Sequence, residues 1–452
     1  MSHIIVNCRA IIVLLTMILF VLSATPSVFA PTIPEDSWTY AQPAPFEGRN
    51  QAVVLNNKIY VLTNSKNLFF EYDPATNVWT QKTSMPTSRW TFAICACENK
   101  VYVIGGVTKS LGYGSDLTTG VTEAYDPQTD TWETKAEMPT KRAQMNAETV
   151  NGKIYVISGE TGGMRTEVDV TEVYDPNTDS WTTKTPIPTP RVLYASAVMD
   201  NKIHVIRNGH QIYDTETDTW CNGALVPKPA YTSAAACATT GTDAPKRIYV
   251  VGGDKSFASA MDLVYSYDPA SDAWTKCACL QIARMGHGVA VVNDLVYAIS
   301  GATDFVTATP TVERYRPFEY GTIPATIGII YPETKTYTTN EIPLEFTINK
   351  PITWMGYSLD GKNNVTVFSN STLKQLPEGN HNITVYATDI KGNTGASITK
   401  HFDIKLFDQH PQQNDDKSDS SIDLVVIAAI AVTAVGATFV IYHKKLRKHS
   451  ER

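Results

Sequence analysis

The sequence predicts an all-β protein in which six four-stranded units close into a ring, followed by a small β-sandwich and one C-terminal membrane helix. Three observations carry this prediction. A phrase built of Tyr, Asp-Pro and Trp recurs five times, first as "EYDPATNVWT" (71–80) and last as "SYDPASDAWT" (266–275). Apolar and polar residues alternate over much of 323–407, and a 21-residue apolar run, 422–442, precedes a basic tail. Repetition, alternation and apolar length each indicate a different kind of element.

The recurring phrase predicts a β-hairpin. Asp bonds its own backbone and Pro presets φ, so each Asp-Pro forms a tight turn, with Asp214-Thr215 as the one variant. Aromatic and β-branched residues flank the turn, and a Tyr and a Trp seven residues apart can anchor one sheet face. The anchor pairs are Tyr72/Trp79, Tyr125/Trp132, Tyr174/Trp181, Tyr213/Trp220 and Tyr267/Trp274.

A second pattern accompanies each hairpin. A Pro and usually an Arg follow each Trp, as in "MPTSR" (85–89), and then come two strands joined by a tight polar turn, as in "NKVYVIGG" (99–106). Four strands in 39 to 54 residues fit a propeller blade. Over about residues 35–320 these marks resemble the Kelch repeat family, and the resemblance implies a Kelch-like propeller. The double glycine of that family is intact only at Gly105-Gly106 and Gly252-Gly253.

Counting strands predicts how the ring closes. The second strand of the unit occurs six times, but the sixth copy is followed by Tyr315 with no Trp seven residues later. Conversely, Trp38 has no Tyr seven residues before it. We therefore expect the N-terminal strand at Trp38 to pair with the strand at Tyr315 and complete the sixth blade. Closure would cover two sheet edges that otherwise invite association.

The first 30 residues predict a secretory signal. Arg9 precedes a 13-residue apolar run that is too short for an ordinary membrane span, and small residues follow it. Cleavage after Ala24 and cleavage after Ala30 both remain open.

The other end predicts a single-pass membrane protein. At ~1.5 Å per residue, a helix over 422–442 is long enough to cross a bilayer. Five Lys or Arg in 443–452 place that tail in the cytoplasm and the rest of the mature chain outside. Ala429, Thr433 and Ala437 form a stripe of small residues that is compatible with a weak helix dimer.

The segment 323–407 predicts a β-sandwich, since alternating strands are separated by turns such as Asp360-Gly361. Its "VYATDIKGNTGAS" (385–397) resembles the end of immunoglobulin-like modules in archaeal and bacterial surface proteins. It contains no Cys, so an inter-sheet disulfide is excluded. The polar segment 408–421 predicts a stalk. In an exported chain, three sequons would be acceptors for N-glycosylation: Asn364, Asn370 and Asn382.

Composition and motifs exclude some functions. A net charge of −7, with no basic run outside the tail, argues against nucleic acid as a partner. The spacing of His and Cys fits no metal site, and no catalytic constellation is recognised, so the sequence predicts a non-enzyme without metal or cofactor. The six Cys outside the signal fit either buried thiols or disulfides, and both remain open.

The loops predict where a ligand binds. The turns between the first and second strands and the Asp-Pro hairpins share one face and are short, whereas the opposite face carries long, variable connections over 107–121, 160–170 and 302–311. Variable loops on a rigid scaffold are typical of binding surfaces. Candidate ligand residues at this loop face are Trp90, Gln144, Tyr194, Tyr231 and His287, together with Arg89, Arg142, Arg191 and Arg284. For the arginines, the alternative is that they brace neighbouring blades.

These features together predict a membrane-anchored binding or adhesion protein at the cell surface. Its propeller would face an extracellular glycan or a surface protein. Two alternatives remain open: a surface glycan-active propeller enzyme, and a structural component of the cell envelope.

Overall fold

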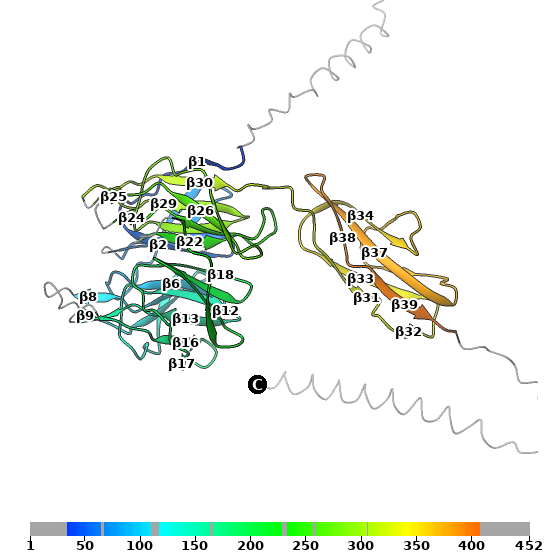
Figure 1. Ribbon diagram of the computed structural model, residues 1–452, viewed down its shortest axis with the longest axis horizontal. Helices are drawn as coiled ribbons and strands as arrows, with labels where there is room; N and C mark the ends of the chain where they lie inside the picture. The colour runs from blue at the N-terminus through cyan, green and yellow to red at the C-terminus, as the bar shows by residue number, and fades with distance from the viewer. Residues whose placement is uncertain are drawn as a thin grey trace, which may run out of the picture.

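The computed structural model describes residues 34–406, apart from 65–66, 110–116, 163–165, 228–232, 256–258 and 305 (Figure 1). The predicted signal, stalk, membrane helix and tail lie outside these residues. Every regular element over the described range is a β-strand. None of the described residues form a helix long and apolar enough to cross a membrane.

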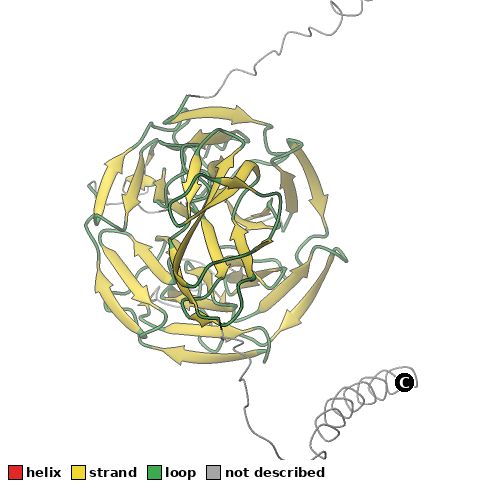
Figure 2. Ribbon diagram, turned by 90° about the vertical axis from the view of Figure 1, so that its right-hand side faces the viewer, coloured by secondary structure: helices red, strands yellow, loops and turns green. Residues whose placement is uncertain are grey.

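The N-terminal domain consists of six four-stranded antiparallel sheets that follow one another around a ring (Figure 2). We number these sheets as blades in chain order. Blade 1 contains β2 (Asn50–Leu55), β3 (Lys58–Thr63), β4 (Phe69–Asp73) and β5 (Val78–Lys82). Blade 2 contains β6 (Ala93–Cys97), β7 (Lys100–Ile104), β10 (Thr122–Asp126) and β11 (Thr131–Lys135). Blade 3 contains β12 (Asn146–Val150), β13 (Lys153–Ile157), β16 (Thr171–Asp175) and β17 (Ser180–Lys184).

The remaining three blades complete the ring. Blade 4 contains β18 (Ala195–Met199), β19 (Lys202–Ile206), β20 (His210–Asp214) and β21 (Thr219–Asn222). Blade 5 contains β22 (Ala235–Ala238), β23 (Ile248–Val251), β26 (Val264–Asp268) and β27 (Ala273–Lys276). Blade 6 contains β28 (Gly288–Val292), β29 (Leu295–Ile299), β30 (Val312–Arg316) and, from the other end of the domain, β1 (Ser37–Ala41).

The predicted closure strand is confirmed. Strand β1 pairs antiparallel with β30 and places Trp38 opposite Tyr315. The N-terminal segment also supplies a third residue, because Asp36 accepts hydrogen bonds from Tyr315 Oη at 2.8 Å and from Ala278 N at 2.7 Å. In the local hairpin of blade 2, Asp130 accepts the same two bonds, from Tyr125 Oη and from Thr83 N. The short N-terminal strand therefore reproduces a complete hairpin anchor.

The Trp anchors join each blade to the blade before it. In blade 2, Trp132 lies directly opposite Tyr125, and its ring centroid is 5.2 Å from that of Tyr125. Its indole N–H donates to Thr83 O of blade 1 at 2.8 Å. The same donation to the preceding blade is made by Trp38, Trp79, Trp181, Trp220 and Trp274. The phrase recurs because every joint between blades uses it once.

The double glycine lies at the joints between blades on the loop face, where it contacts the following blade. Gly106 N of blade 2 donates to Arg142 O of blade 3 at 3.0 Å. Gly105 has φ of +61°, and a Cβ added there would lie 2.7 Å from Arg142 O. A larger residue would therefore separate the two blades.

The first strands of the six blades, β2, β6, β12, β18, β22 and β28, lie nearest the axis and contact one another around the ring. The connections after the second strands form small ladders on the predicted loop face. These ladders are β8 (Val107–Lys109) with β9 (Leu117–Thr118), β14 (Glu160–Thr161) with β15 (Thr166–Glu167), and β24 (Asp254–Lys255) with β25 (Ser259–Ala260). In Figure 1, β8, β9, β24 and β25 lie at the left of the ring, and the C-terminal domain lies at the right.

The C-terminal domain has two sheets around one core. One sheet contains β31 (Ile327–Tyr331), β33 (Ile342–Ile348) and β36 (Ser371–Leu373). The other contains β32 (Thr336–Tyr337), β39 (Lys400–Ile404), β37 (Gly379–Asp389), β34 (Ile352–Leu359) and β35 (Val365–Thr366), with β38 (Thr394–Ala396) on β37. Leu344 of the first sheet and Val385 of the second are fully buried in the same apolar cluster.

Polar contacts fix this domain to the short-turn face of the ring. Asp243, in the β22–β23 turn of blade 5, accepts a backbone bond from Gly321 N at 2.6 Å. Its carboxylate lies 3.5 Å from Lys391 Nζ, and Lys391 also lies over the ring of Tyr320. The buried Asp294 holds the turn itself, because it accepts the N–H of Asp243 at 2.7 Å. The loop face therefore points away from the C-terminal domain.

All six cysteines within the described residues are free. Cys95 and Cys97 lie on β6 in a buried apolar cluster. Burial raises the pKa of the Cys95 thiol well above its usual value, which suits an unreactive core residue. The structure thus favours the thiol alternative over disulfides.

Candidate binding site at the mouth of the channel

Backbone hydrogen bonds between neighbouring blades form a belt around the channel on the loop face. The bonded residues lie at or just before the start of the first strand of each blade. In each step a residue of one blade donates its N–H to a carbonyl of the preceding blade. The donor–acceptor pairs are Gln144–Thr91, Leu193–Gln144, Ser233–Leu193, Gly286–Ser233 and Asn50–Gly286, at 2.9 to 3.2 Å. At the sixth joint a side chain makes the link, because Gln51 Nε2 donates to Phe92 O at 2.6 Å.

The belt repeats one backbone conformation with different side chains. Five belt residues have φ between 49° and 57°, namely Thr91, Gln144, Leu193, Ser233 and Gly286. Arg49 occupies the equivalent position in blade 1, two residues before the residue that pairs with Leu62. Residues other than glycine rarely adopt this conformation, and it persists where surrounding contacts impose it. A backbone conformation shared by five blades thus presents different side chains around one opening, and Arg49 of blade 1 adds a sixth residue type without that conformation.

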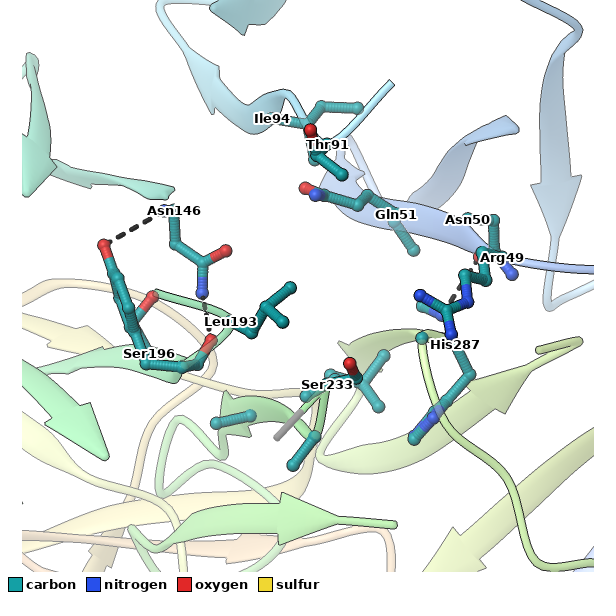
Figure 3. Close-up of a pocket in the computed structure, with 18 of the residues that line it drawn as sticks. Arg49, Asn50, Gln51, Thr91, Ile94, Asn146, Leu193, Ser196, Ser233 and His287 are labelled. Carbon is teal, nitrogen blue, oxygen red and sulfur yellow. Dashed lines mark hydrogen bonds between the residues drawn. The ribbon is translucent and has the colours of Figure 1, made fainter. Parts of the chain in front are cut away.

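The belt encloses a cavity of about 170 Å³. Figure 3 shows Arg49, Thr91, Leu193 and Ser233 around it, with Gln51 and Asn146 from the first strands. The lining mixes amide, hydroxyl and guanidinium groups with apolar side chains such as Ile94, Met145 and Leu193, and it includes Glu148. Arg49 is exposed, whereas Thr91, Gln144, Leu193 and Ser233 are half-buried. The mouth can therefore form hydrogen bonds and one charge contact with a ligand that enters from the loop face.

Deeper in the channel lies a carboxylate that sequence reasoning missed. A second cavity of about 310 Å³ is lined mainly by Ala, Val and Cys of the first strands. Into it Glu148 of β12 places its carboxylate, which accepts a hydrogen bond from Ser196 Oγ of β18. Burial raises the pKa of Glu148 to about 7, although the channel leaves part of its side chain open to water.

A sequence signal for Glu148 did exist. It lies opposite Tyr155 of the second strand, and the equivalent residues of the other blades are Val53, Cys95, Ala197, Cys237 and Ala290. A single charged residue at a position that is otherwise small or apolar marks the site. The belt residues had no comparable motif, because their common feature is a backbone conformation.

The predicted ligand residues have different locations. Gln144 lies in the belt, and its side-chain amide donates to Glu160. His287 lines the cavity, is only 3% exposed, and has no hydrogen-bond partner for either ring nitrogen among the described residues. Burial lowers the pKa of His287 to about 3, so its ring is neutral. Trp90 is half-buried beside the loop ladder of blade 2, where its backbone pairs with Val107.

Tyr194 and Tyr231 do not join this set. Tyr194 is 4% exposed, and its hydroxyl donates to Ile157 O at 2.5 Å and accepts from Asn146 N at 3.0 Å. It therefore acts as a brace between blades 3 and 4 beneath the mouth, and it is not a surface aromatic. Tyr231 lies outside the described residues.

Three of the four arginines are enclosed. Arg89, Arg142 and Arg284 have no exposed side-chain area and pair with Glu123, Glu172 and Glu313, respectively. They are therefore not available to a ligand. The bracing alternative also needs correction, because each guanidinium ties the segment before a first strand to later strands of the same blade. Arg142, for example, donates to Val156 O of β13 at 2.9 Å. Arg191 differs from all three.

Comparisons with known proteins support the propeller fold described above. Residues 91–139, 141–188 and 245–281 match the family model described as the Kelch motif. The human Kelch repeat and BTB domain-containing protein 12 is 28% identical over 160 residues, which are 30% of this chain and 26% of that protein. Kelch-like protein 15 of Danio rerio is 24% identical over 56% of this chain and 38% of its own length. The chain thus matches well under half of either relative.

A solved structure titled "Structure of YjhT" aligns with a TM-score of 0.54 at 16% identity, over 60% of this chain and 95% of that one. At that identity the alignment speaks for the fold alone. With the matched motifs and the ring of four-stranded sheets, it supports the predicted Kelch-repeat β-propeller.

Proposed function

We propose that this chain is a cell-surface binding protein whose six-bladed Kelch-type propeller holds a protein partner at the mouth of its channel. The belt carries the proposal: five blades repeat one backbone conformation with five different residue types, from Thr91 to Gly286, and Arg49 adds a sixth type at the equivalent position of blade 1. Variable side chains on a rigid frame suit recognition.

The contacts at the mouth favour a protein partner over a free sugar. The cavity within the belt measures about 170 Å³ and adjoins the second cavity of about 310 Å³, with which it shares Glu148 and Ser196. An inserted side chain of a partner could enter this space from the loop face. The exposed Arg49 and the half-buried Leu193 offer a charged and an apolar contact beside it, and such mixed anchors are typical of protein interfaces.

The proposed protein is anchored in the cell membrane with its propeller outside the cell. The signal over 1–30, the apolar run 422–442 and the basic tail support a single-pass protein with its propeller outside the cell. The C-terminal domain, which we propose to be an immunoglobulin-like module, docks on the short-turn face, so the mouth would face away from the membrane. Protease added to intact cells should then degrade the propeller, and protection of the propeller would contradict this topology.

Paired variants on the two faces test the binding role. Arg49→Glu with Leu193→Asp changes the mouth, and Lys153→Glu with Val78→Asp makes matched changes on the short-turn face. Proteins bound to the full chain would be fixed on intact cells and quantified by mass spectrometry. We expect the mouth pair to lose the partner and the control pair to keep it. Equal loss from both would refute the assignment, and a glycan or a converted sugar released instead would favour the glycan-active alternative.

A further inference from the structure

Blades 2, 3 and 6 share a buried brace that blade 4 lacks. In blade 3, Arg142 pairs with Glu172 and donates to Thr140 O at 3.0 Å. Thr140 in turn donates its N–H and its hydroxyl to Glu172. Arginine and glutamate thus close a small polar pocket in which donors and acceptors balance.

In blade 4 a glutamine closes this pocket alone. Gln211 lies opposite Val205 on the second strand, as Glu172 lies opposite Val156. Its Oε1 accepts from Thr189 N at 3.0 Å, and its Nε2 donates to Thr189 O at 3.0 Å. The amide therefore replaces both the glutamate acceptor and the arginine donor.

As a consequence, Arg191 is displaced from the brace. Its guanidinium donates to Pro190 O at 3.1 Å, and no carboxylate of the described residues lies within ion-pair distance. Its Nε is buried without a hydrogen-bond partner. The side chain is half-buried, whereas Arg142 is fully enclosed. The chain thus retains a cation at the loop face without the partner that its repeat provides elsewhere.

A second guanidinium belongs to Arg207 of the same blade. A Cβ added at Gly209 would lie 3.5 Å from Arg191 Nη2 and 3.8 Å from Arg207 O, so the two arginines approach each other there. Arg207 follows the second strand of blade 4, where Ser158 and Ser300 follow the second strands of blades 3 and 6. Its Nη1 donates to Val192 O and lies 4.0 Å from the exposed Glu167, and its Nε also lacks a partner. Burial lowers the pKa of Arg207, and the nearby positive charge of Arg191 contributes to that lowering, while Glu167 and Asp254 oppose it.

The geometry points to an anion-binding subsite: we propose that Arg191 and Arg207 together bind one carboxylate of the partner protein, an Asp or Glu side chain. This inference rests on the proposed function, because it names a contact of that same loop face. Guanidinium groups bind carboxylates through paired N–H···O bonds. Arg191 and Arg207 are half-buried, and neither has the buried glutamate partner that satisfies the guanidinium of Arg142. Glu167 and Asp254 limit the local positive charge, which suits one carboxylate better than a polyanion. Glu167 would compete with the ligand.

Three changes with different expected signs test the subsite. Gln211→Glu recreates the carboxylate of Glu172 and should draw Arg191 back into the brace without unfolding blade 4. Arg191→Gln with Arg207→Gln removes both cations, and Glu167→Gln removes the competing acid. Arg247→Gln, on the short-turn face, is the matched control. Thermal unfolding verifies that each variant is folded.

The probe is a fluorescein-labelled, C-terminally amidated hexapeptide with one glutamate among five glutamines, with the all-glutamine hexapeptide for comparison, added to the detergent-solubilised full chain. We expect Gln211→Glu and the double arginine variant to weaken binding by at least about tenfold, and Glu167→Gln to tighten it about two- to threefold. Arg247→Gln should change nothing. Wild-type affinity in both the Gln211→Glu and double arginine variants, or equal binding of the two peptides, would overturn the subsite.

Two further results show whether the ligand class or the proposed mouth is assigned wrongly. Glucuronate that competes at far lower concentration than the glutamate peptide would overturn the assignment to a protein carboxylate in favour of an acidic sugar. If the mouth variants leave partner capture intact while Gln211→Glu still abolishes peptide binding, the subsite stands and the proposed mouth is wrong.

Discussion

Replacing Trp38 with alanine should destabilise the propeller at the blade that the N-terminal strand completes. Trp38 is 7% exposed, and its ring centroid lies 5.0 Å from that of Tyr315. Its indole N–H donates to Ala278 O of blade 5 at 2.9 Å. The change therefore removes a buried aromatic contact within blade 6 and a hydrogen bond to blade 5.

The expected loss is large for one residue. Truncation of a buried Trp to Ala costs ~3–5 kcal/mol, and a domain is typically stable by ~5–15 kcal/mol. For a domain of this size each kcal/mol corresponds to ~2–4 °C, so the melting temperature should fall by about 10 °C.

Differential scanning calorimetry of the full chain measures this fall. Trp132→Ala is the matched control, because Trp132 makes the same contacts within a local hairpin. The two variants should lose similar stability, although the partner strand of Trp38 lies at the far end of the domain. A synthetic peptide of residues 34–42 should restore part of the loss in a chain that lacks them. An unchanged melting temperature for Trp38→Ala would show that the ring is held closed in another way.

Three further predictions address charge and the domain joint. Burial raises the pKa of Glu148 to about 7, above its usual 4.5, so ionisation opposes folding. The free energy of unfolding should therefore fall as pH rises from 4.5 to about 7, and urea titrations should show a smaller fall for Glu148→Gln; an identical fall would contradict it. Glu172→Gln leaves Arg142 buried without its counter-charge and should cost ~3–5 kcal/mol in urea unfolding, whereas an unaltered midpoint would mean that the brace carries no stability. Asp243→Ala removes contacts to Lys391 and Lys350 and should broaden the distance distribution in small-angle scattering; an unaltered distribution would show that other contacts fix the joint.

The ring was predictable because its chemistry is local and repeated. Tyr125 and Trp132 meet across a tight turn, so their spacing alone indicates the hairpin. The pairing of Trp38 with Tyr315 followed from the count of strands. The role of Asp36 did not follow, since the segment before Trp38 lacks the Tyr that marks this Asp in the other copies.

The site was less predictable. A recurring Arg suggested one role for every copy, yet Arg142 is enclosed by Glu172 and Arg191 is not, because residue 211 is Gln. That residue lies about twenty positions later and on another strand, so spacing near the arginine carries no signal of it. Tyr194 belongs to the same class of error, since only the structure reveals its hydroxyl contact with Ile157 O.

Photocrosslinking on intact cells tests the central claim most directly. A benzophenone amino acid would replace the exposed Arg49 at the mouth in one full-length chain and the exposed Gln128 on the opposite hairpin in another. Binding at the mouth predicts a discrete crosslinked protein from position 49 and none from position 128. Adducts from position 128 alone, or equally from both positions, would contradict recognition at the loop face.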